Sequence, residues 1–372
     1  MGARIILATF VAFFAVACGS ADSEPLAFVE EATTTSTTAA PTTTTSTTTT
    51  TTSTTTTTIA PTTTADPGPL YPLTGEPIGD GNTSPHAAIV VKVNNNDGTA
   101  RAALRGIEAA DIIYEERIEQ QATRFAAVFH SELPTEVGSV RSARTSDIDI
   151  VANLNRPVFA FSGANDGVMG QVRAAQRNGW LNFASEDNGN WQFGLTGAFR
   201  RPNKTVVNVE GLASVATVSA GPEPLYDYSN NVAKLGTPSA GVSISARVEA
   251  NFVWDATQGG GYDRYQVRTA AVTRDGIHVS PANVVVMTTH YRTSSIDSAS
   301  VDAVSIGSGR VVVYSDGHRV EGTWTRSHRE DGYTLTATSG ETIGLAPGQT
   351  WVSMTPPGTD REITPDVAAN FG

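Results

Sequence analysis

Residues 114–150, YEERIEQQATRFAAVFHSELPTEVGSVRSARTSDIDI, decide the fold because they alternate apolar runs with charged side chains. The runs IIY at 112–114 and FAAVF at 125–129 are typical of buried strands. The residues 120–122 between them predict a hairpin that joins strands 111–119 and 123–130. A charge buried alone beside a core costs several kcal/mol, so these charges must be paired or used. We therefore expect a polar site at the edge of a core.

The hairpin and the segment after it supply an arginine-rich candidate site. Strand alternation places Glu115 and Arg117 on one face and Glu116 on the other. We expect Arg117 to lie near Arg124 across the hairpin, and two neighbouring arginines favour an anion or a carboxylate between them. The turn residues 94–96 are asparagines whose amides can line the same cleft. The candidate ligand-binding residues are Asn94, Asn96, Arg117, Arg124, Arg141 and Arg144.

The acidic side chains of this stretch leave two alternatives open. In one, Glu115 or Glu116 works opposite Asp147 as an acid–base pair, as in glycan cleavage, which needs two carboxyl groups about 5–9 Å apart across a cleft. In the other, these carboxylates form buried ion pairs with the arginines and a helix cap, in a helix that Thr145 or Ser146 caps and that runs to Asn153. His130 ends a strand and is expected to be a hydrogen-bonded structural residue. The sequence alone leaves the catalytic residues unknown.

The N-terminus has the pattern of an exported, lipid-anchored protein. Residues 1–18 contain one arginine, an apolar run too short to span a bilayer comfortably, and the ending Ala-Val-Ala-Cys, which resembles a bacterial lipobox. Cys18 is the only cysteine, so it is the expected lipidation site and a disulfide framework is excluded. An ordinary secretory signal is the alternative. Residues 19–69 are rich in Thr, Ser and Pro and predict a disordered tether, and the Thr tract is a candidate for O-glycosylation.

The chain after the tether divides by pattern into two parts. Residues 70–218 predict an α/β (α+β) domain. Residues 219–241 are rich in Pro, Gly and Ser and predict a linker. Residues 242–358 hold eight short, alternating segments separated by Gly and Asp-Gly turns, the pattern of a smaller antiparallel β-rich domain, and residues 359–372 form a tail. Further elements expected in the first domain are strands at 87–93 and 157–163, helices at 100–110, 145–153, 165–178 and 209–217, and a long surface loop at 180–204.

Composition and motifs argue against several classes of function. The net charge of −12 argues against a nucleic-acid binder. The chain has no G-x-S-x-G, H-E-x-x-H or P-loop motif, and none of its three lysines follows a serine at the S-x-x-K spacing. Its six histidines are scattered singly, so we expect neither a metal site nor a cofactor. Residues 114–204 carry as many basic as acidic side chains, and such an island in an acidic chain favours an anionic ligand.

Several motifs match a known family. PLTGEPI, VKVNNN, YEERIE, TRFAAVFHS, VGSVRSARTSDIDI and PVFAFSGAN resemble the N-terminal domain of the YerB-like bacterial lipoproteins. Trp254, Tyr262, Arg264, Tyr265, NVVV, GTW at 322–324 and LAPGQTWV resemble the C-terminal domain of the same family. The resemblance runs from about residue 70 to the end and implies an anchored envelope protein with an α/β domain followed by a β-rich one. The function of the family is unknown, so the resemblance implies no catalytic residues.

We therefore expect an extracytoplasmic protein, lipid-anchored to the outer face of a bacterial cytoplasmic membrane. It is expected to be non-enzymatic and to bind an anionic wall component such as peptidoglycan, or an envelope partner, through its Arg/carboxylate site. Two alternatives stay open: an enzyme that acts on peptidoglycan or another glycan with a Glu/Asp pair, and a protein–protein scaffold in the envelope.

Overall fold

The computed structural model describes residues 68–79, 86–216, 221–257 and 259–372. The expected signal peptide, its Cys18 and nearly all of the expected tether lie outside the described residues. Residues Thr64–Gly372 form one compact unit, which contains every described residue.

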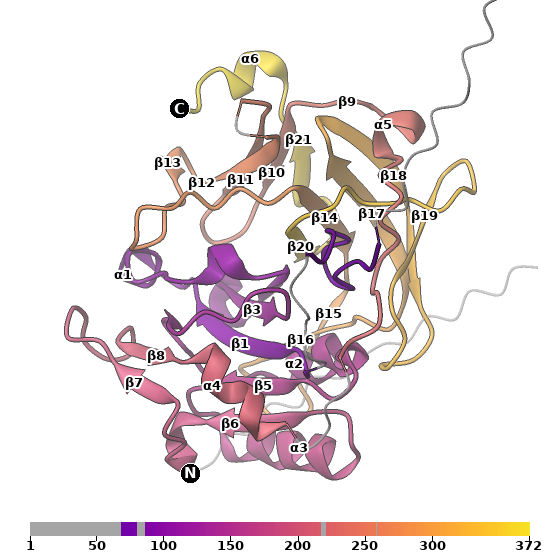
Figure 1. Ribbon diagram of the computed structural model, residues 1–372. Helices are drawn as coiled ribbons and strands as arrows, with labels where there is room; N and C mark the ends of the chain where they lie inside the picture. The colour runs from indigo at the N-terminus through magenta and orange to yellow at the C-terminus, as the bar shows by residue number, and fades with distance from the viewer. Residues whose placement is uncertain (1–67, 80–85, 217–220, 258) are drawn as a thin grey trace, which may run out of the picture. The chain divides into compact units, whose positions relative to one another are not determined.

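One mixed sheet of eleven strands forms the centre of this unit (Figure 1). Its strands run in the order β19-β18-β17-β14-β20-β2-β3-β1-β5-β6, and β9 pairs with β18. The strands from the first part of the chain are β1 (Ile89–Asn94), β2 (Ile112–Arg117), β3 (Thr123–Phe129), β5 (Val158–Phe161) and β6 (Asn182–Ser185). The strands from the second part are β9 (Thr237–Pro238), β14 (Asn283–Thr288), β17 (Gly307–Ser315), β18 (His318–Arg326), β19 (Thr334–Ala337) and β20 (Thr350–Thr355).

The two predicted domains share this sheet. β20, near the end of the chain, lies parallel to β2, with Thr350 opposite Ile112. Apolar side chains from both parts of the chain pack together on each face of the sheet, so both parts contribute to both core layers. The domain boundaries at residues 218 and 241 stay a prediction from the sequence pattern.

The predicted hairpin is confirmed, but its register corrects one expected contact. β2 and β3 pair antiparallel, with Glu116 opposite Arg124 and Arg117 opposite Thr123. Cross-strand partners share a face, so Arg124 lies with Glu116 while Arg117 lies on the other face with Glu115. The expected proximity of Arg117 to Arg124 is wrong, because an offset of one residue in register moves a side chain to the opposite face.

Two predicted helices after the hairpin are confirmed. α2 (Thr145–Val151) and α3 (Asp166–Arg177) lie where the apolar periodicity predicts them. The Asn165 side chain caps α3 by accepting the Val168 N–H at 2.9 Å. α2 continues as a 3-10 turn, η3 (Ala152–Leu154). Further short helices are η2 (Glu119–Gln121), which lies between β2 and β3, η4 (Glu186–Asn188), α4 (Val209–Leu212), η5 (Ala213–Val215), α5 (Val232–Leu235) and α6 (Pro365–Ala368).

The expected helix at 100–110 is broken into two pieces. α1 ends early, as Gly98–Ala102, and a 3-10 turn, η1, follows at Ile107–Ala109. Gly106 separates them with a φ of 71°, and a Cβ at this position would lie 2.5 Å from the Glu136 carbonyl oxygen. Only glycine permits both the left-handed backbone and this close approach.

The expected long loop at 180–204 contains two strands. β6 extends the central sheet, parallel to β5. β7 (Phe193–Leu195) pairs antiparallel with β8 (Thr205–Val207) in a small sheet that also includes β4 (Val137–Gly138). Three of the four residues of β6 are buried, so the strand lacks the apolar–polar alternation by which a half-exposed strand is recognised.

All eight segments predicted as strands in the second part are strands. β14 corrects the expected antiparallel pattern, because it lies parallel to β20 inside the central sheet. A separate five-stranded sheet has the order β13-β12-β11-β10-β21. Its strands are β10 (Gly241–Ile244), β11 (Ala250–Asp255), β12 (Gly261–Gln266), β13 (Thr269–Ala270) and β21 (Asp360–Glu362), and β15 (Tyr291–Thr293) pairs separately with β16 (Val301–Ala303).

Candidate functional site

Three of the predicted arginines meet at the carboxyl end of the central sheet. β1 and β5 are parallel neighbours, but the segment 139–142 enters between their carboxyl ends. Arg141 N donates to Lys92 O at 2.8 Å on one side, and Ser162 N donates to Arg141 O at 2.9 Å on the other. Ligands of open α/β sheets bind where neighbouring strands diverge in this way.

The register of this segment decides which side chains share a face. The segment pairs antiparallel with β1 at Val93 and Val140, whose side chains lie in the core layer on one face. Side chains alternate along extended chains, so the residues that flank these two valines, Lys92 and Asn94 on β1 and Ser139 and Arg141 on the segment, face the opposite side of the sheet. β3 adds Arg124, opposite Asn94. The polar side chains on this face are Lys92, Asn94, Glu116, Arg124, Ser139 and Arg141.

Arg124 is a buried guanidinium without a carboxylate partner among the described residues. It is 3% exposed, its Nη1 donates to the Ser142 carbonyl oxygen at 2.9 Å, and its Nε is buried without a hydrogen-bond partner. Burial, and then the neighbouring guanidinium groups of Arg144 and Arg141, lower the pKa of Arg124 to about 9. Cations crowded in this way favour a bound anion.

Arg141 is the second cation that lacks a partner in the described part of the chain. It is half-buried, its side chain makes no hydrogen bond or ion pair there, and its Nε is shielded from solvent. Burial and the nearby Arg144 lower the pKa of Arg141, and Asp97 opposes this shift. Ser139 is 1% exposed, and its hydroxyl also has no partner among the described residues. Two arginine Nε–H groups and one hydroxyl of this region are therefore buried without a hydrogen-bond partner among the described residues.

Arg144, in contrast, already holds a carboxylate. Its Nε and Nη2 donate to the two oxygens of Glu119 at 2.6 and 2.8 Å, a bidentate geometry. Ser300 Oγ donates to the same carboxylate at 2.7 Å. Burial by itself raises the pKa of Glu119, but the hydrogen bonds from Arg144 and Ser300 outweigh it and lower that pKa to about 2. We refer to Arg124, Arg141, Arg144 and Ser139 together as the arginine site.

Asn94 and Asn96 lie beside the arginine site, and the Asn94 amide is already in use. Asn94 Nδ2 donates to Asn203 Oδ1 at 2.6 Å, and Asn94 Oδ1 accepts the Asn96 backbone N–H at 3.3 Å. Asn96 Oδ1 is buried without a partner among the described residues. These bonds hold the predicted turn and the loop that contains Asn203, and ligand binding by the two asparagines stays a prediction.

Next to the arginine site, a buried lysine lies between two carboxylates. The side chains of Lys92, Glu116 and Asp147 are all 0% exposed. Lys92 Nζ donates to Asp147 Oδ1 at 2.6 Å and to Glu116 Oε1. The other oxygen of Asp147 accepts the Arg144 backbone N–H at 2.7 Å, which caps α2. Burial raises the pKa of Glu116, Lys92 opposes that shift, and Asp147 adds to it.

Glu115 lies on the opposite face of the hairpin, in a different ion pair. Its carboxylate accepts the Thr123 hydroxyl at 2.7 Å, the Trp351 indole N–H at 3.1 Å and Arg264 Nη2 at 3.4 Å. Arg264 is 1% exposed, and its Cζ lies 4.8 Å from the centroid of the Trp351 ring. This cluster joins the first part of the chain to the second, and it places Glu115 and Glu116 on opposite faces of the sheet.

His130 is buried next to another histidine. It is 8% exposed, and its ring centroid lies 4.7 Å from that of His86. Burial, with a smaller contribution from His86, lowers the pKa of His130 to about 4, so the ring is neutral at neutral pH. Its Nδ1 makes no hydrogen bond to a described residue, but a hydrogen bond with the His86 backbone opposes the effect of burial on the pKa of His130.

Two charged residues of these clusters were not predicted from the sequence. Lys92 left a signal, because it is one of only three lysines and interrupts the apolar run AAIVVKV, where a charge must find a partner. Arg264 is one of the residues that resemble the family's C-terminal domain, but nothing in its alternating segment indicates a pairing with Glu115, which is far away along the chain. The sequence did identify three arginines that the structure brings together, and it misplaced Arg117.

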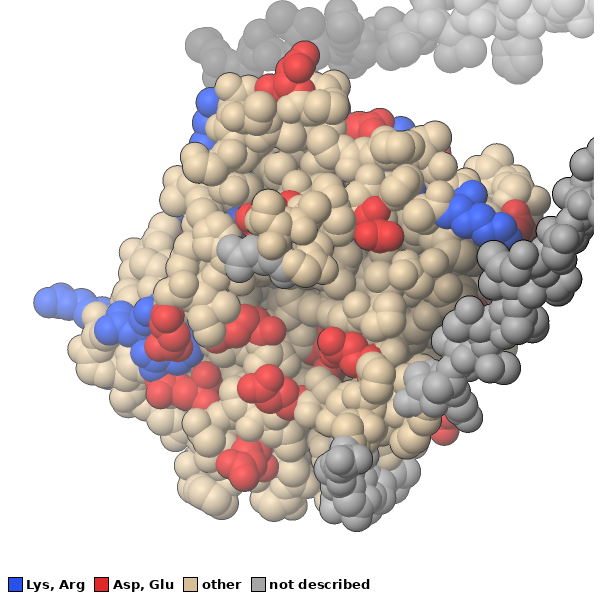
Figure 2. All heavy atoms as spheres, turned by 45° about the horizontal axis from the view of Figure 1, so that its top comes forward, with Lys and Arg blue, Asp and Glu red and all other residues tan. Residues whose placement is uncertain are grey.

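The surface charge limits how an anion reaches the site. In Figure 2, acidic side chains are spread over the visible face, while basic ones lie toward its edges. The net charge of −12 means that the long-range field repels anions. Long-range electrostatics therefore do not favour an anion at the arginine site, and only short-range contacts with its partly buried guanidinium groups do.

The described part of the chain shows neither a metal site nor a membrane-spanning helix. None of its His, Cys, Asp and Glu side chains form a group of three or more placed to hold a metal ion. Of the helices described, none combines the length and the apolar character needed to cross a bilayer.

Comparison with known proteins agrees with this architecture. One family model, "Protein of unknown function (DUF3048) N-terminal domain", matches residues 73–221, and the corresponding C-terminal domain model matches residues 241–352. Putative lipoprotein YerB of Bacillus subtilis (strain 168) is 24% identical over 281 residues, which is 72% of this chain and 81% of that protein. The crystal structure of YerB from Bacillus subtilis superposes with a TM-score of 0.68 at 19% identity, covering 79% of this chain and 99% of that chain.

These matches and the fold define a class of protein: an α/β part followed by a part rich in antiparallel strands, with no established function. The chain belongs to the DUF3048 family, whose two domain models together cover more than half of it. The predicted fold class and the predicted resemblance to the YerB-like family are therefore confirmed.

Proposed function

We propose that this protein is a non-enzymatic module of the bacterial cell envelope that binds an anionic component through its arginine site. Peptidoglycan, which bears carboxylates, is the proposed wall component. The chain is proposed to be held on the outer face of the cytoplasmic membrane by a lipid on Cys18. Support for the anchor comes from the lipobox-like ending of residues 1–18 and from the similarity to a protein named a putative lipoprotein.

One observation carries the binding proposal: Arg124 is 3% exposed and has no carboxylate partner among the described residues. Burying an unpaired guanidinium costs several kcal/mol, so a fold that maintains one gains stability when an anion binds. Arg141, which is also unpaired in the described structure, lies close enough to Arg144 for its pKa to be lowered by it. A carboxylate or phosphate between Arg124 and Arg141 would relieve this repulsion through charge-assisted hydrogen bonds.

Binding is better supported than acid–base catalysis. Glu116 and Asp147 are both 0% exposed and both bind Lys92, so neither faces a cleft that a glycan could enter. Glu115 is 7% exposed and is held by Arg264 and Trp351 on the other face. The geometry required of a glycosidase pair, two carboxyl groups across an open cleft, is absent from the described candidates.

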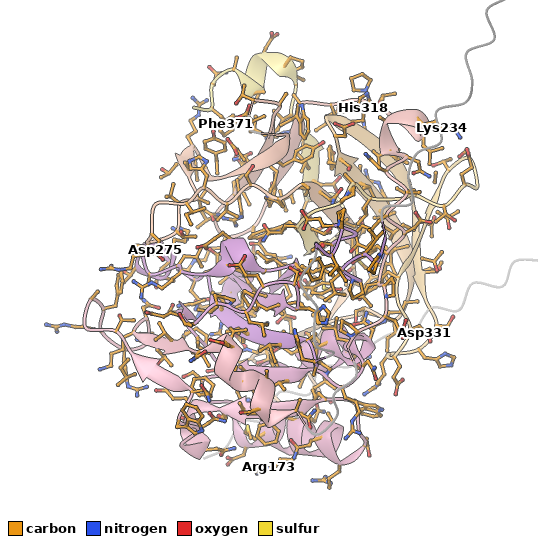
Figure 3. All side chains as sticks on the ribbon, in the orientation of Figure 1. Arg173, Lys234, Asp275, His318, Asp331 and Phe371 are labelled. Carbon is orange, nitrogen blue, oxygen red and sulfur yellow. The ribbon has the colours of Figure 1, made fainter. Side chains whose placement is uncertain are left out.

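The test is a binding assay on the fragment from Ala65 to Gly372. The fragment is incubated with purified peptidoglycan and pelleted, and the supernatant is analysed by mass spectrometry. Arg141→Ala should weaken pelleting by roughly 10- to 100-fold, because a charge-assisted hydrogen bond contributes about 1.5–3 kcal/mol. Arg173→Ala is the matched control, because Arg173 is an exposed arginine on α3 (Figure 3).

The two variants must first have the circular dichroism spectrum of the wild type. Unchanged pelleting of a folded Arg141→Ala protein removes the main support for the proposal. New wall fragments in the supernatant that disappear with Glu116→Gln or Asp147→Asn would instead make the protein an enzyme.

A further inference from the structure

We infer that the arginine site binds its anion together with one proton, and that Glu116 accepts this proton. The inference rests on the proposed anion binding and concerns the regulation of the same site. Glu116 lies directly opposite Arg124 on the same face of the β2–β3 hairpin. An anion held by Arg124 is therefore added next to a carboxylate that is already fully buried.

The buried charges around Glu116 do not balance among themselves. Lys92 supplies one positive charge to two carboxylates, Glu116 and Asp147. The surplus negative charge is compensated by the nearby guanidinium groups, since Asp147 stabilises the charged form of Arg124 and Glu116 that of Arg144. The groups that face Glu116 are Lys92 from β1, Arg124 from β3, Arg144, Ser146 and Asp147 at the start of α2, and Tyr291 from β15.

Anion binding removes part of this compensation. Arg144 is already paired with Glu119, so Arg124 and Arg141 provide the free compensation for the surplus charge. An anion held between them adds a negative charge on the face that carries Glu116, and a nearby like charge disfavours the ionised carboxylate. A buried charge in that position is disfavoured by several kcal/mol, and a proton taken from solvent neutralises it.

Glu116 is the acceptor because one of its carboxylate oxygens has no hydrogen-bond partner among the described residues. Asp147 uses one oxygen for Lys92 and the other for the Arg144 backbone N–H, so both of its oxygens already accept hydrogen bonds. Glu116 is ion-paired through one oxygen only. Burial already raises the pKa of Glu116 in the free protein, and Lys92 opposes this shift.

The experiment measures proton uptake during anion binding to the full chain. Two probes distinguish the two chemistries, with acetate standing for a carboxylate and sulfate for a tetrahedral oxyanion. Each is titrated calorimetrically between about pH 6 and about pH 8.5, where both probes stay ionised, in two buffers with different ionisation enthalpies. The expected result is uptake of up to one proton per anion and an affinity that falls by up to about tenfold per pH unit as the pH rises.

Glu116→Gln is the diagnostic variant, because it keeps the shape of the side chain and mimics the protonated state. It should bind the same probe with no proton uptake and no change in affinity with pH. Uptake that persists in Glu116→Gln overturns the assignment of the acceptor. If the variant does not fold, the wild-type titration still decides the matter, because binding without proton uptake refutes the inference. Failure of both probes to bind at every pH refutes the proposed function, and the inference with it.

Discussion

Replacing Lys92 with Met tests whether the buried charge cluster holds this fold together. The side chains of Lys92, Glu116 and Asp147 are all 0% exposed, and the lysine is hydrogen-bonded to both carboxylates. Removing one partner of a buried ion pair typically costs about 3–5 kcal/mol, because the remaining charge is left unpaired. Met has nearly the length and volume of the lysine stem, so the cavity contribution is small. We expect Lys92→Met to lower the free energy of unfolding by about 3–5 kcal/mol at about pH 8.

The loss should become smaller as the pH falls. Without the lysine, which opposes the rise, the pKa of Glu116 in the folded state rises further, and protonation then removes an unpaired charge. Urea denaturation at several pH values measures the effect. Lys234→Met is the control, because Lys234 lies at the surface on α5 (Figure 3) with its side chain 79% exposed, and it should not change the stability measurably. A Lys92→Met protein within about 1 kcal/mol of the wild type at alkaline pH would refute the reasoning.

Two further predictions concern other buried charges. Arg264→Met leaves Glu115 unpaired and should destabilise the protein by about 3–5 kcal/mol in urea denaturation. Because one sheet spans both parts of the chain, the transitions followed by fluorescence and by circular dichroism should coincide. Separate transitions would contradict a shared core. Burial raises the pKa of Asp111 to about 6, although hydrogen bonds from Ser131 oppose this shift. The protonated Asp111 therefore contributes fully to stability below about pH 4, and this contribution is lost as the pH rises through about 6. The stability difference between wild type and Asp111→Asn should therefore change by roughly 3 kcal/mol between these limits, and a difference independent of pH would rule the shift out.

The features of this fold that can be predicted from the sequence are those that depend on residues close together in the chain. The β2–β3 hairpin, α2 and α3 were predicted because apolar periodicity and turn or cap residues act within a few positions of one another. The arginine site was partly predicted because Arg124, Arg141 and Arg144 fall within one short stretch. Arg117 was misplaced because the hairpin register, which the turn conformation decides, was not known to the single residue.

The pairing of charges between distant segments was beyond local reasoning. Glu115 meets Arg264 across 149 positions of the chain, and nothing near either residue indicates the other. The two carboxylates on Lys92 come from β2 and α2, and the sequence alone allows them either to pair with arginines or to act as an acid–base pair. In the structure, Glu116 and Asp147, one of the candidate acid–base pairs, are therefore both ion-paired with Lys92.

By itself, the sequence determined the order of most strands and helices, the fold class and the family, because these depend on backbone periodicity and on residues that are close along the chain. Only the tertiary structure decided that both parts of the chain share one sheet, that Glu115 and Glu116 belong to opposite faces, and that Arg124 and Arg141 lack a carboxylate among the described residues. The physical reason is that strand register is set by packing between distant segments, and a shift of one residue exchanges the buried partners of every charge.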